Sequence, residues 1–237
     1  MLELLQQVDT SIFEFINQGL SNDFFDTLMP WFREKLFWVP LYVFLILVVV
    51  IRFRKYAYMV ILTAILTVVI ADQLSSHVVK PTAQRTRPCN ELELQAQINV
   101  LAPCSGSFSF TSSHAVNHFA VAAFFIALLG ETNRRFRVLW LWAASIAFAQ
   151  VYVGLHYPFD VFIGGLLGVS IGFLCYQMLL VFYLKKVPNF WLRHKLSILA
   201  NISTFICPKV FSYVNYSYFE ALFGIGNQSQ DIIDKNQ

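Results

Sequence analysis

The chain reads Ala149-Gln150-Val151-Tyr152-Val153-Gly154-Leu155-His156-Tyr157-Pro158-Phe159-Asp160 where two long apolar runs meet. Proline suits the first turn of a helix, so we expect a helix to begin near Pro158 and to hold Asp160 at the positive end of its dipole. A carboxylate in that position stays ionised and can orient an imidazole. The stretch therefore indicates a junction between two helices at which His156 acts as a nucleophile or base, with Asp160 fixing its tautomer.

The composition is that of an integral membrane protein. Of the 237 residues, 57% are hydrophobic and 13% are charged. The mean hydropathy of +0.58 lies well outside the balance of a soluble domain. A formal charge of +3 is too small to indicate a polyanionic partner, so we expect no nucleic acid. The first twenty residues lack a basic start and include Glu3, Asp9 and Glu14, which argues against a cleavable signal peptide.

Five apolar runs are each close to the roughly 20 residues that a helix needs to cross a bilayer. Their alternation with connections favours a compact antiparallel bundle, so the predicted fold class is all-α, a polytopic membrane bundle over residues 36–183. Residues 1–35 are too short and too polar to span, and we expect an interfacial amphipathic helix there. The five expected spans are Leu36–Phe53, Tyr58–Val79, Ser113–Leu129, Val138–Leu155 and Phe159–Tyr183.

The C-terminal part, residues 184–237, is a basic and amphipathic segment with a polar tail. Its apolar stretch Leu196–Cys207 is short, so we expect it to lie at the interface, with a sixth span as the alternative. Within the fifth span, glycines recur at four-residue spacing, which lets another helix approach the backbone closely. We interpret Gly164, Gly168 and Gly172 as packing residues of the bundle.

Basic residues gather at one end of the expected spans, and by the positive-inside rule that end is cytoplasmic. The opposite face then holds residues 1–35, the connection from about Lys80 to Ser112 and the turn with His156. We expect the protein in the inner membrane of a bacterium, with its chemistry facing the periplasm. The basic residues are Arg52, Arg54, Lys55, Arg134, Arg135, Arg137, Lys185, Lys186, Arg193 and Lys195.

Two of the four cysteines, Cys89 and Cys104, lie in the same outward connection. An oxidising compartment favours a disulfide between them, which would contribute about 3 kcal/mol in the chain-entropy model. Two free thiols remain the alternative. A zinc site is less favoured, because the connection contains no histidine to complete a set of ligands.

Cations cluster at the outer end of the second span, where Lys80 and Arg87 flank Arg85. Such a cluster binds either lipid headgroups or a phosphate ester, and taken alone it favours headgroups. A lysine supplies a point charge and an arginine a planar fork, and the two together suit the several oxygens of a phosphate.

The third expected span opens with Ser112, Ser113 and His114. Hydroxyl side chains are natural N-caps, and the free N–H groups of a helix start can bind an anion. We interpret His118, like His77, as structural or supporting. A metal site made of His114 and His118 is the less favoured alternative, because no third ligand lies nearby in the sequence.

An ionisable residue, Asp72, lies inside the second expected span. Intramembrane acids are functional by default. We nevertheless favour a structural role, in which Asp72 is a buried acceptor paired with Gln73 or Gln150.

Three motifs, in this order and separated by the expected spans, resemble the signature of the type 2 phosphatidic acid phosphatase family of membrane lipid phosphatases. The second motif reads Thr111-Ser112-Ser113-His114 where the family usually has Pro-Ser-Gly-His. Ahead of the third motif the family usually has Ser-Arg where this chain has Ala149-Gln150, so a neutral amide replaces a cation. The motifs are Lys80-x6-Arg87-Pro88, the Ser112/His114 element and His156-x3-Asp160.

The resemblance implies that His156 attacks phosphorus to give a phosphohistidine, that Asp160 orients it and that His114 protonates the leaving oxygen. It also implies no divalent metal and no other cofactor, because cationic side chains stabilise the phosphoryl group. Gln150 would donate a neutral hydrogen bond, with Arg85 as a further cation. The resemblance thus implies phosphate-binding roles for Lys80, Arg87, Ser112 and Ser113, and we add Gln150 and Arg85 as the expected substitutes for the family's arginine.

By this resemblance the chain is a lipid phosphatase that hydrolyses a phosphate or diphosphate ester of a lipid at the outer face of the membrane. Small bacterial members that resemble it act on undecaprenyl diphosphate, phosphatidylglycerophosphate, phosphatidate or lipid A. The alternative is a weakened or inactive relative that binds lipid or supports assembly, because Gln150 stands in place of an arginine. Release of inorganic phosphate separates the two hypotheses.

Overall fold

In a computed structural model, which describes residues 2–94, 96–130 and 133–184, the chain is helical and these residues contain no strand. The predicted all-α class is therefore confirmed over this part of the chain. The principal helices are α1 (Leu2–Glu14), α2 (Asp23–Arg33), α3 (Val39–Phe53), α4 (Ala57–Gln73), α5 (Lys80–Ala83), α6 (Ser113–Leu129), α7 (Val138–Tyr152) and α8 (Pro158–Leu184).

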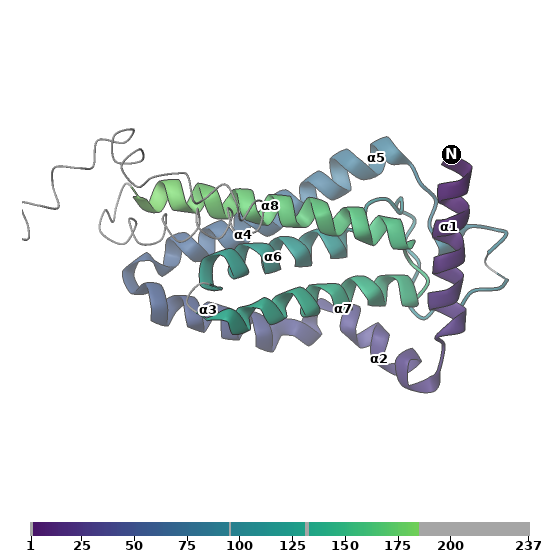
Figure 1. Cartoon of the computed structure of the whole chain (residues 1–237), viewed down its shortest axis with the longest axis horizontal. Coiled ribbons are helices and arrows are strands. Elements are labelled where there is room, and N and C mark those ends of the chain that lie inside the picture. The colour runs from purple at the N-terminus through teal and green to yellow at the C-terminus, as the bar shows by residue number, and fades with distance from the viewer. Residues whose placement is uncertain (1, 95, 131–132, 185–237) are drawn as a thin grey trace, which may run out of the picture. The chain divides into compact units, whose positions relative to one another are not determined.

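Short turns join the helices that run alongside one another (Figure 1). Between α3 and α4 the backbone reverses at Arg54, which has a φ of 47°. A π-helical segment, Leu74–Val79, continues α4 into α5. Helix α6 packs extensively on both α7 and α4. Two helical stretches, Lys35–Ala83 and Pro158–Val181, are long and apolar enough to cross a bilayer, and the first of them folds back at Arg54. The count of five spans stays a prediction.

The small-residue face of α8 lies against α6, as the glycine spacing predicts. A Cβ atom on Gly168 would overlap the carbonyl oxygen of Val116, and one on Gly172 would overlap that of Ala120. At Gly164 the same atom would lie 3.1 Å from the carbonyl oxygen of Ser112. The backbones of α6 and α8 therefore approach each other at a distance that only glycine permits.

The N-terminal segment forms two helices rather than the single interfacial helix that the sequence suggests. A π-helical turn follows α1, and α2 begins after Asn22, whose side chain accepts a hydrogen bond from the Phe25 amide at 3.0 Å. That capping bond explains the break, because it satisfies an otherwise unpaired N–H at the start of α2. α2 packs on α7.

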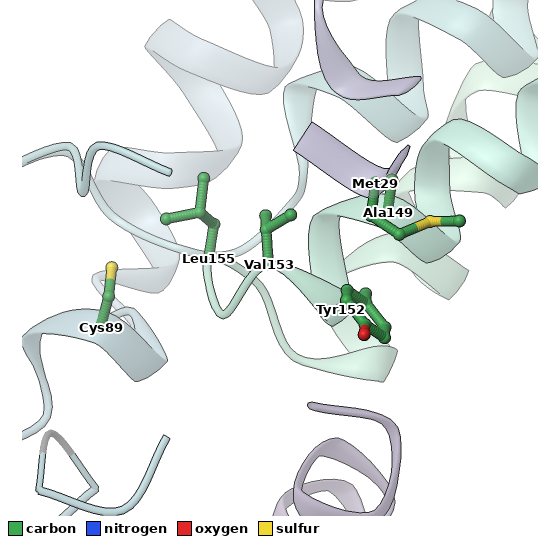
Figure 2. Close-up of a cluster of buried hydrophobic side chains, with 6 residues drawn as sticks. All are labelled: Met29, Cys89, Ala149, Tyr152, Val153 and Leu155. Carbon is green, nitrogen blue, oxygen red and sulfur yellow. The ribbon is translucent and has the colours of Figure 1, made fainter. Parts of the chain in front are cut away.

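A buried cluster fixes α2 to the end of α7 and to the outer connection (Figure 2). Met29 of α2 lies beside Ala149 and Tyr152 of α7, and Cys89 belongs to the same cluster. The Tyr152 hydroxyl donates to Asp26 Oδ1 at 2.5 Å. Residues far apart in sequence are thereby held around the turn that follows α7.

Two further predictions concern the partner of Asp72 and the C-terminal segment. Asp72 accepts a hydrogen bond from the amide of Asn117 at 3.1 Å, so the predicted pairing with Gln73 or Gln150 is wrong. Asn117 lies 45 residues further along the chain, and only the packing of α4 on α6 brings the two together. The C-terminal segment 184–237, with the alternative span Leu196–Cys207, lies outside the described residues except for Leu184.

Candidate active site

The site forms where α5, the connection that follows it, the start of α6 and the turn between α7 and α8 meet. A disulfide joins Cys89 to Cys104 across the connection, as predicted, and the bonded cysteines are 15 residues apart in sequence. The bridge holds the segment after Arg87 close to the segment before Ser107. Both of these residues contribute to the site.

His156 is buried in the turn, with 2% of its surface exposed. Its Nε2 atom lies 3.1 Å from Nη1 of Arg87. A guanidinium can only donate, so Nε2 is the unprotonated nitrogen that accepts this bond. The proton is therefore on Nδ1, which faces Asp160 Oδ2 at 3.5 Å and Ser109 Oγ at 3.4 Å.

Burial lowers the pKa of His156 to about 4, against the opposing effect of its hydrogen bond to Asp160. The positive charges of Arg87 and Lys80 lower the pKa further. At neutral pH the ring is uncharged, and its unprotonated nitrogen is Nε2, whose lone pair accepts the hydrogen bond from Arg87. That is the protonation state a nucleophilic histidine needs.

The carboxylate of Asp160 is fully buried and is held from several directions. Oδ2 accepts hydrogen bonds from the hydroxyl of Ser109 and, at 2.9 Å, from the amide of Tyr157. Oδ1 accepts from Nη1 of Arg85 at 2.8 Å. So many donors stabilise the ionised form and fix its orientation toward His156.

The turn itself is shaped by a glycine and by the N-terminal segment. Gly154 has a φ of 84°, and a Cβ atom there would lie 2.9 Å from the carbonyl oxygen of Asn99. Asn17, in the π-helical turn after α1, donates to the carbonyl oxygens of Asn99 at 2.8 Å and Tyr152 at 2.7 Å. The amide of His156 donates to the carbonyl oxygen of Gln150 at 3.2 Å. Hydrogen bonds thus fix the backbone of the turn both before His156 and at His156 itself.

Two of the predicted phosphate-binding cations are buried and anchored on the connection. Arg87 donates from Nε to the carbonyl oxygen of Ser107 at 2.8 Å and from Nη2 to the Ser107 hydroxyl at 3.0 Å. Lys80 donates from Nζ to the carbonyl oxygens of Phe108 and Ser109 at 2.8 and 3.2 Å. Neither cation is more than 7% exposed. Burial lowers the pKa of Arg87, whereas Asp160 raises it.

The start of α6 supplies the remaining predicted residues. The buried Ser112 hydroxyl has no hydrogen-bond partner within the described part of the chain, and its amide donates to the carbonyl oxygen of Asp160 at 3.1 Å. The Ser113 hydroxyl bonds to Ser75 and Ser76 at 3.0 and 3.2 Å, so it faces the segment after α4. Ser112 thus keeps a free hydroxyl next to the first, unpaired N–H groups of the helix.

The two histidines of α6 differ in their surroundings. Their rings are stacked, with centroids 6.1 Å apart. Both ring nitrogens of His118 have partners, namely the His114 carbonyl oxygen at 2.7 Å and the Tyr42 hydroxyl at 3.2 Å. These bonds fit the supporting role expected of His118. The ring of His114 interacts electrostatically with His156.

Gln150 and Arg85 are both predicted to contact phosphate, but they differ in the partners that surround them. Gln150 is 1% exposed, and neither atom of its amide has a hydrogen-bond partner among the described residues. Arg85 instead lies between two fully buried carboxylates, 2.6 Å from Asp9 and 2.8 Å from Asp160. Its guanidinium also lies 3.9 Å from the centre of the Tyr157 ring.

Sequence reasoning misses Asp9 and Ser109. Asp9 belongs to α1, where it also accepts from the amide of Phe159 at 2.8 Å. Burial raises its pKa, and the bonds from Phe159 and Arg85 oppose that shift. A signal exists for Ser109, because it lies in a serine-rich stretch just before the second motif. The sequence gives no such signal for Asp9, which is simply an acidic residue in an amphipathic helix.

Comparison with known proteins agrees with the motifs. The PAP2 superfamily matches residues 53–183. A lipid A 4'-phosphatase of Bacteroides thetaiotaomicron is 33% identical over 185 residues, which cover 74% of this chain and 79% of that protein. An undecaprenyl-diphosphatase of Sulfolobus acidocaldarius is 28% identical over 158 residues, or 64% of this chain and 68% of that protein.

Among solved structures, LpxE of Aquifex aeolicus superposes with a TM-score of 0.54 at 25% identity. The match covers 72% of this chain and 95% of LpxE. The shared fold, the match over more than half of the chain and the grouping of His156 with Asp160 and Arg87 lead to one conclusion. This chain belongs to the PAP2 superfamily and is an integral membrane lipid phosphatase.

Proposed function

We propose that the protein removes a phosphate group from a lipid at the outer face of a bacterial inner membrane, through a phosphohistidine on His156. The observation that carries the proposal is the hydrogen bond between Arg87 and Nε2 of His156. It leaves the nucleophilic lone pair beside the cation that a phosphate would bind. The basic residues of the turn at Arg54 and of Arg134–Arg137 belong to the other ends of the helices, which supports the outward orientation.

In the first step Nε2 of His156 attacks phosphorus, the N–P bond forms and the ester P–O bond breaks. The developing imidazolium keeps its Nδ1 proton directed at Asp160, whose charge stabilises it. Lys80, Arg87 and the N–H groups at the start of α6 hold the phosphoryl oxygens, together with the free hydroxyl of Ser112.

The leaving oxygen takes its proton from His114. A bound phosphate dianion favours the protonated form of a neighbouring imidazole, so the substrate itself prepares this acid. A water molecule then attacks phosphorus, the N–P bond breaks, and inorganic phosphate leaves with His156 restored. His114 accepts a proton from the water in this second step.

No divalent metal is needed in this scheme, because fixed cations supply the charge that a metal would supply. Arg85 takes a positioning role in it. Its guanidinium is already engaged by Asp9 and Asp160, so it orients the carboxylate rather than contacting phosphate.

For the substrate we favour the phosphate monoester of lipid A, because the Bacteroides relative named above is a lipid A 4'-phosphatase. Undecaprenyl diphosphate is the second candidate, from the Sulfolobus relative. An apolar cavity of about 400 Å³, formed by α3, α4 and α6, suits an acyl chain of such a lipid. Its wall includes His118, which stacks on His114, so the cavity lies near the reacting phosphate.

The test is release of inorganic phosphate by the purified protein in detergent, with EDTA throughout, from lipid A and undecaprenyl diphosphate in parallel. We expect the wild type to prefer lipid A, and we expect His156→Ala to lose about a thousandfold or more of kcat. Arg134→Gln, an exposed residue at the other end of α6 and α7, is the control and should match the wild type. Activity of His156→Ala equal to wild type would rule out the mechanism. A requirement for Mg²⁺ would do the same.

A further inference from the structure

Arg33, the last residue of α2, is a poorly compensated cation. Its side chain is 14% exposed, and its Nε atom is buried without a hydrogen-bond partner among the described residues. The ion pair that it makes, with Glu34, is long at 3.4 Å, and that carboxylate is 58% exposed. An ion pair so open to solvent contributes little.

The cost of this arrangement is clear from a comparison with Arg85. Arg85 is more exposed, at 25%, yet it is paired with two fully buried carboxylates at 2.6 and 2.8 Å. Arg33 is less exposed, and among the described residues its carboxylate partner is the exposed Glu34 alone. Burial lowers the pKa of Arg33, which reflects the penalty of withdrawing a charge from water. An anion bound beside such a group would neutralise its charge and offset this penalty.

The surroundings of Arg33 identify where that anion would be. The positive charge of Arg33 acts on Arg87 and lowers its pKa. It also acts on the ring of His114. Arg33 is therefore close enough to Arg87 and His114 for its charge to act on both, as the packing of α2 on α7 allows. Two buried guanidinium groups near the same imidazole repel each other, and a phosphate dianion between them would turn that repulsion into attraction.

The backbone that presents Arg33 is firmly placed. The carbonyl oxygen of Phe32 accepts a hydrogen bond from Trp38 Nε1 at 2.8 Å. The Trp38 ring contacts that of Trp142, which in turn contacts His118. Further along α2, Met29 packs against α7 (Figure 2). A chain of ring contacts thus connects the end of α2 to the stacked histidines of α6.

We propose that Arg33 is a phosphate-binding residue of the active site, contributed by the N-terminal helix pair. The inference rests on the proposed function and names a third cation for the same phosphate. It also accounts for the neutral side chain at position 150. Gln150 in α7 replaces the family's arginine, and α2, which packs on α7, supplies a guanidinium instead.

The experiment compares wild type, Arg33→Gln and Arg33→Lys, with Arg134→Gln as the matched control for loss of one exposed arginine. Inorganic phosphate is the probe, and its binding to each purified protein is measured by calorimetry in detergent. Loss of a charge-assisted contact should weaken phosphate binding by about tenfold or more in Arg33→Gln. Arg33→Lys keeps the charge without the fork, so its affinity should fall between those of wild type and Arg33→Gln.

A second measurement separates ligand binding from folding. Without phosphate, Arg33→Gln should unfold at or above the wild-type temperature, because the substitution removes a cation that repels Arg87. With phosphate it should gain less stability than wild type. Equal phosphate affinity of wild type and Arg33→Gln would overturn the inference and leave the proposed function intact. A large loss of stability without phosphate would assign Arg33 a structural role and overturn it too. Failure of the wild type to bind phosphate would contradict both proposals.

Discussion

At the scale of single residues, the protonation state of His156 is the property that the fold controls most directly. Its imidazole is surrounded by protein, with Arg87 on Nε2 and Asp160 and Ser109 on Nδ1. Desolvation dominates these contacts and lowers the pKa of the ring to about 4. A histidine exposed in the unfolded chain has a pKa of about 6.5.

The first prediction concerns this titration. In the substrate-free enzyme the His156 ring should stay neutral down to a pH of about 4. Because the folded state binds fewer protons than the unfolded state between those two pKa values, this group's contribution to stability should be full above pH 6.5 and be lost as the pH falls toward 4. NMR of ring-labelled histidine, with His156→Gln to assign the signal, measures the titration. A midpoint near 6.5 would contradict the burial that the structure gives His156.

The second prediction concerns Asp9, which holds Arg85 against Asp160 from α1. Asp9→Asn keeps the acceptor for the Phe159 amide but removes the charge that fixes Arg85. Asp160 then loses part of its support, and a small displacement of a catalytic group costs rate. We expect kcat to fall by roughly tenfold or more, with KM little changed because the phosphate contacts remain.

Phosphate release measured as a function of substrate concentration checks this prediction. Glu3→Gln, an exposed acid on the same helix, is the control and should behave as wild type. If Asp9→Asn raised KM alone, α1 would act on the substrate and not on the carboxylate.

At the scale of helices, the contact of α6 with α8 sets the spacing of the site. α6 carries Ser112 at its cap and α8 carries Asp160 in its first turn. The Ser112 amide donates to the Asp160 carbonyl oxygen at 3.1 Å, so the two helix starts are linked directly. Any change that forces the helices apart must therefore disturb the groups to which we assign catalysis.

The third prediction follows from this contact. Gly168→Ala would place a Cβ atom on the carbonyl oxygen of Val116, and we expect a loss of about 1–3 kcal/mol of stability from overpacking. Gly165→Ala, on the same helix, meets the ring of Phe119 at 3.3 Å, and a side chain can shift where a backbone cannot. Thermal unfolding in detergent compares the two. Equal unfolding temperatures would show that α6 and α8 are not in close backbone contact.

The helices also indicate how far sequence reasoning extends. The third expected span coincides with α6 from Ser113 to Leu129, because serines at a helix start and a long apolar run are local signals. The N-terminal segment instead divides at Asn22, where one side-chain hydrogen bond outweighs the continuous pattern. The glycine spacing predicts a close helix neighbour but cannot say which helix it is.

The parts of the site that sequence reasoning misses depend on contacts between distant residues. The structure brings His156, Asp160 and Arg87 together, as the three motifs predict. Asp9 reaches Arg85 across 76 positions, and nothing in the local sequence of α1 indicates that partner. The sequence around Arg33 likewise gives no sign of a role in the site, because basic residues are common at the ends of amphipathic helices.

At the scale of the whole molecule, the disulfide controls the outer connection. The disulfide between Cys89 and Cys104 closes a loop within the segment from Arg87 to Ser107. Arg87 and Ser107, at the two ends of that segment, are joined by a hydrogen bond. The fourth prediction is that Cys89→Ser/Cys104→Ser loses about 3 kcal/mol of stability by the loop-entropy argument. Its activity should fall as Arg87 loses its anchor.

Chemical denaturation and phosphate release of the double variant test this effect of the bridge. Dithiothreitol should reproduce it in the wild type and should change nothing further in the double variant. Unaltered stability of the wild type under reduction would mean that the connection keeps its shape without the bridge.

The hydrogen bond from the Phe159 amide to Asp9 has a consequence for how the enzyme is made. The two residues are 150 positions apart, and a ribosome takes on the order of ten seconds or more to synthesise that length of chain. Throughout that interval α1 lacks its partner, the turn between α7 and α8. The hydrolytic centre is consequently assembled last, once α7 and the start of α8 have been inserted. By the proposed mechanism, a nascent chain that lacks them has no nucleophile with which to attack the lipids around it.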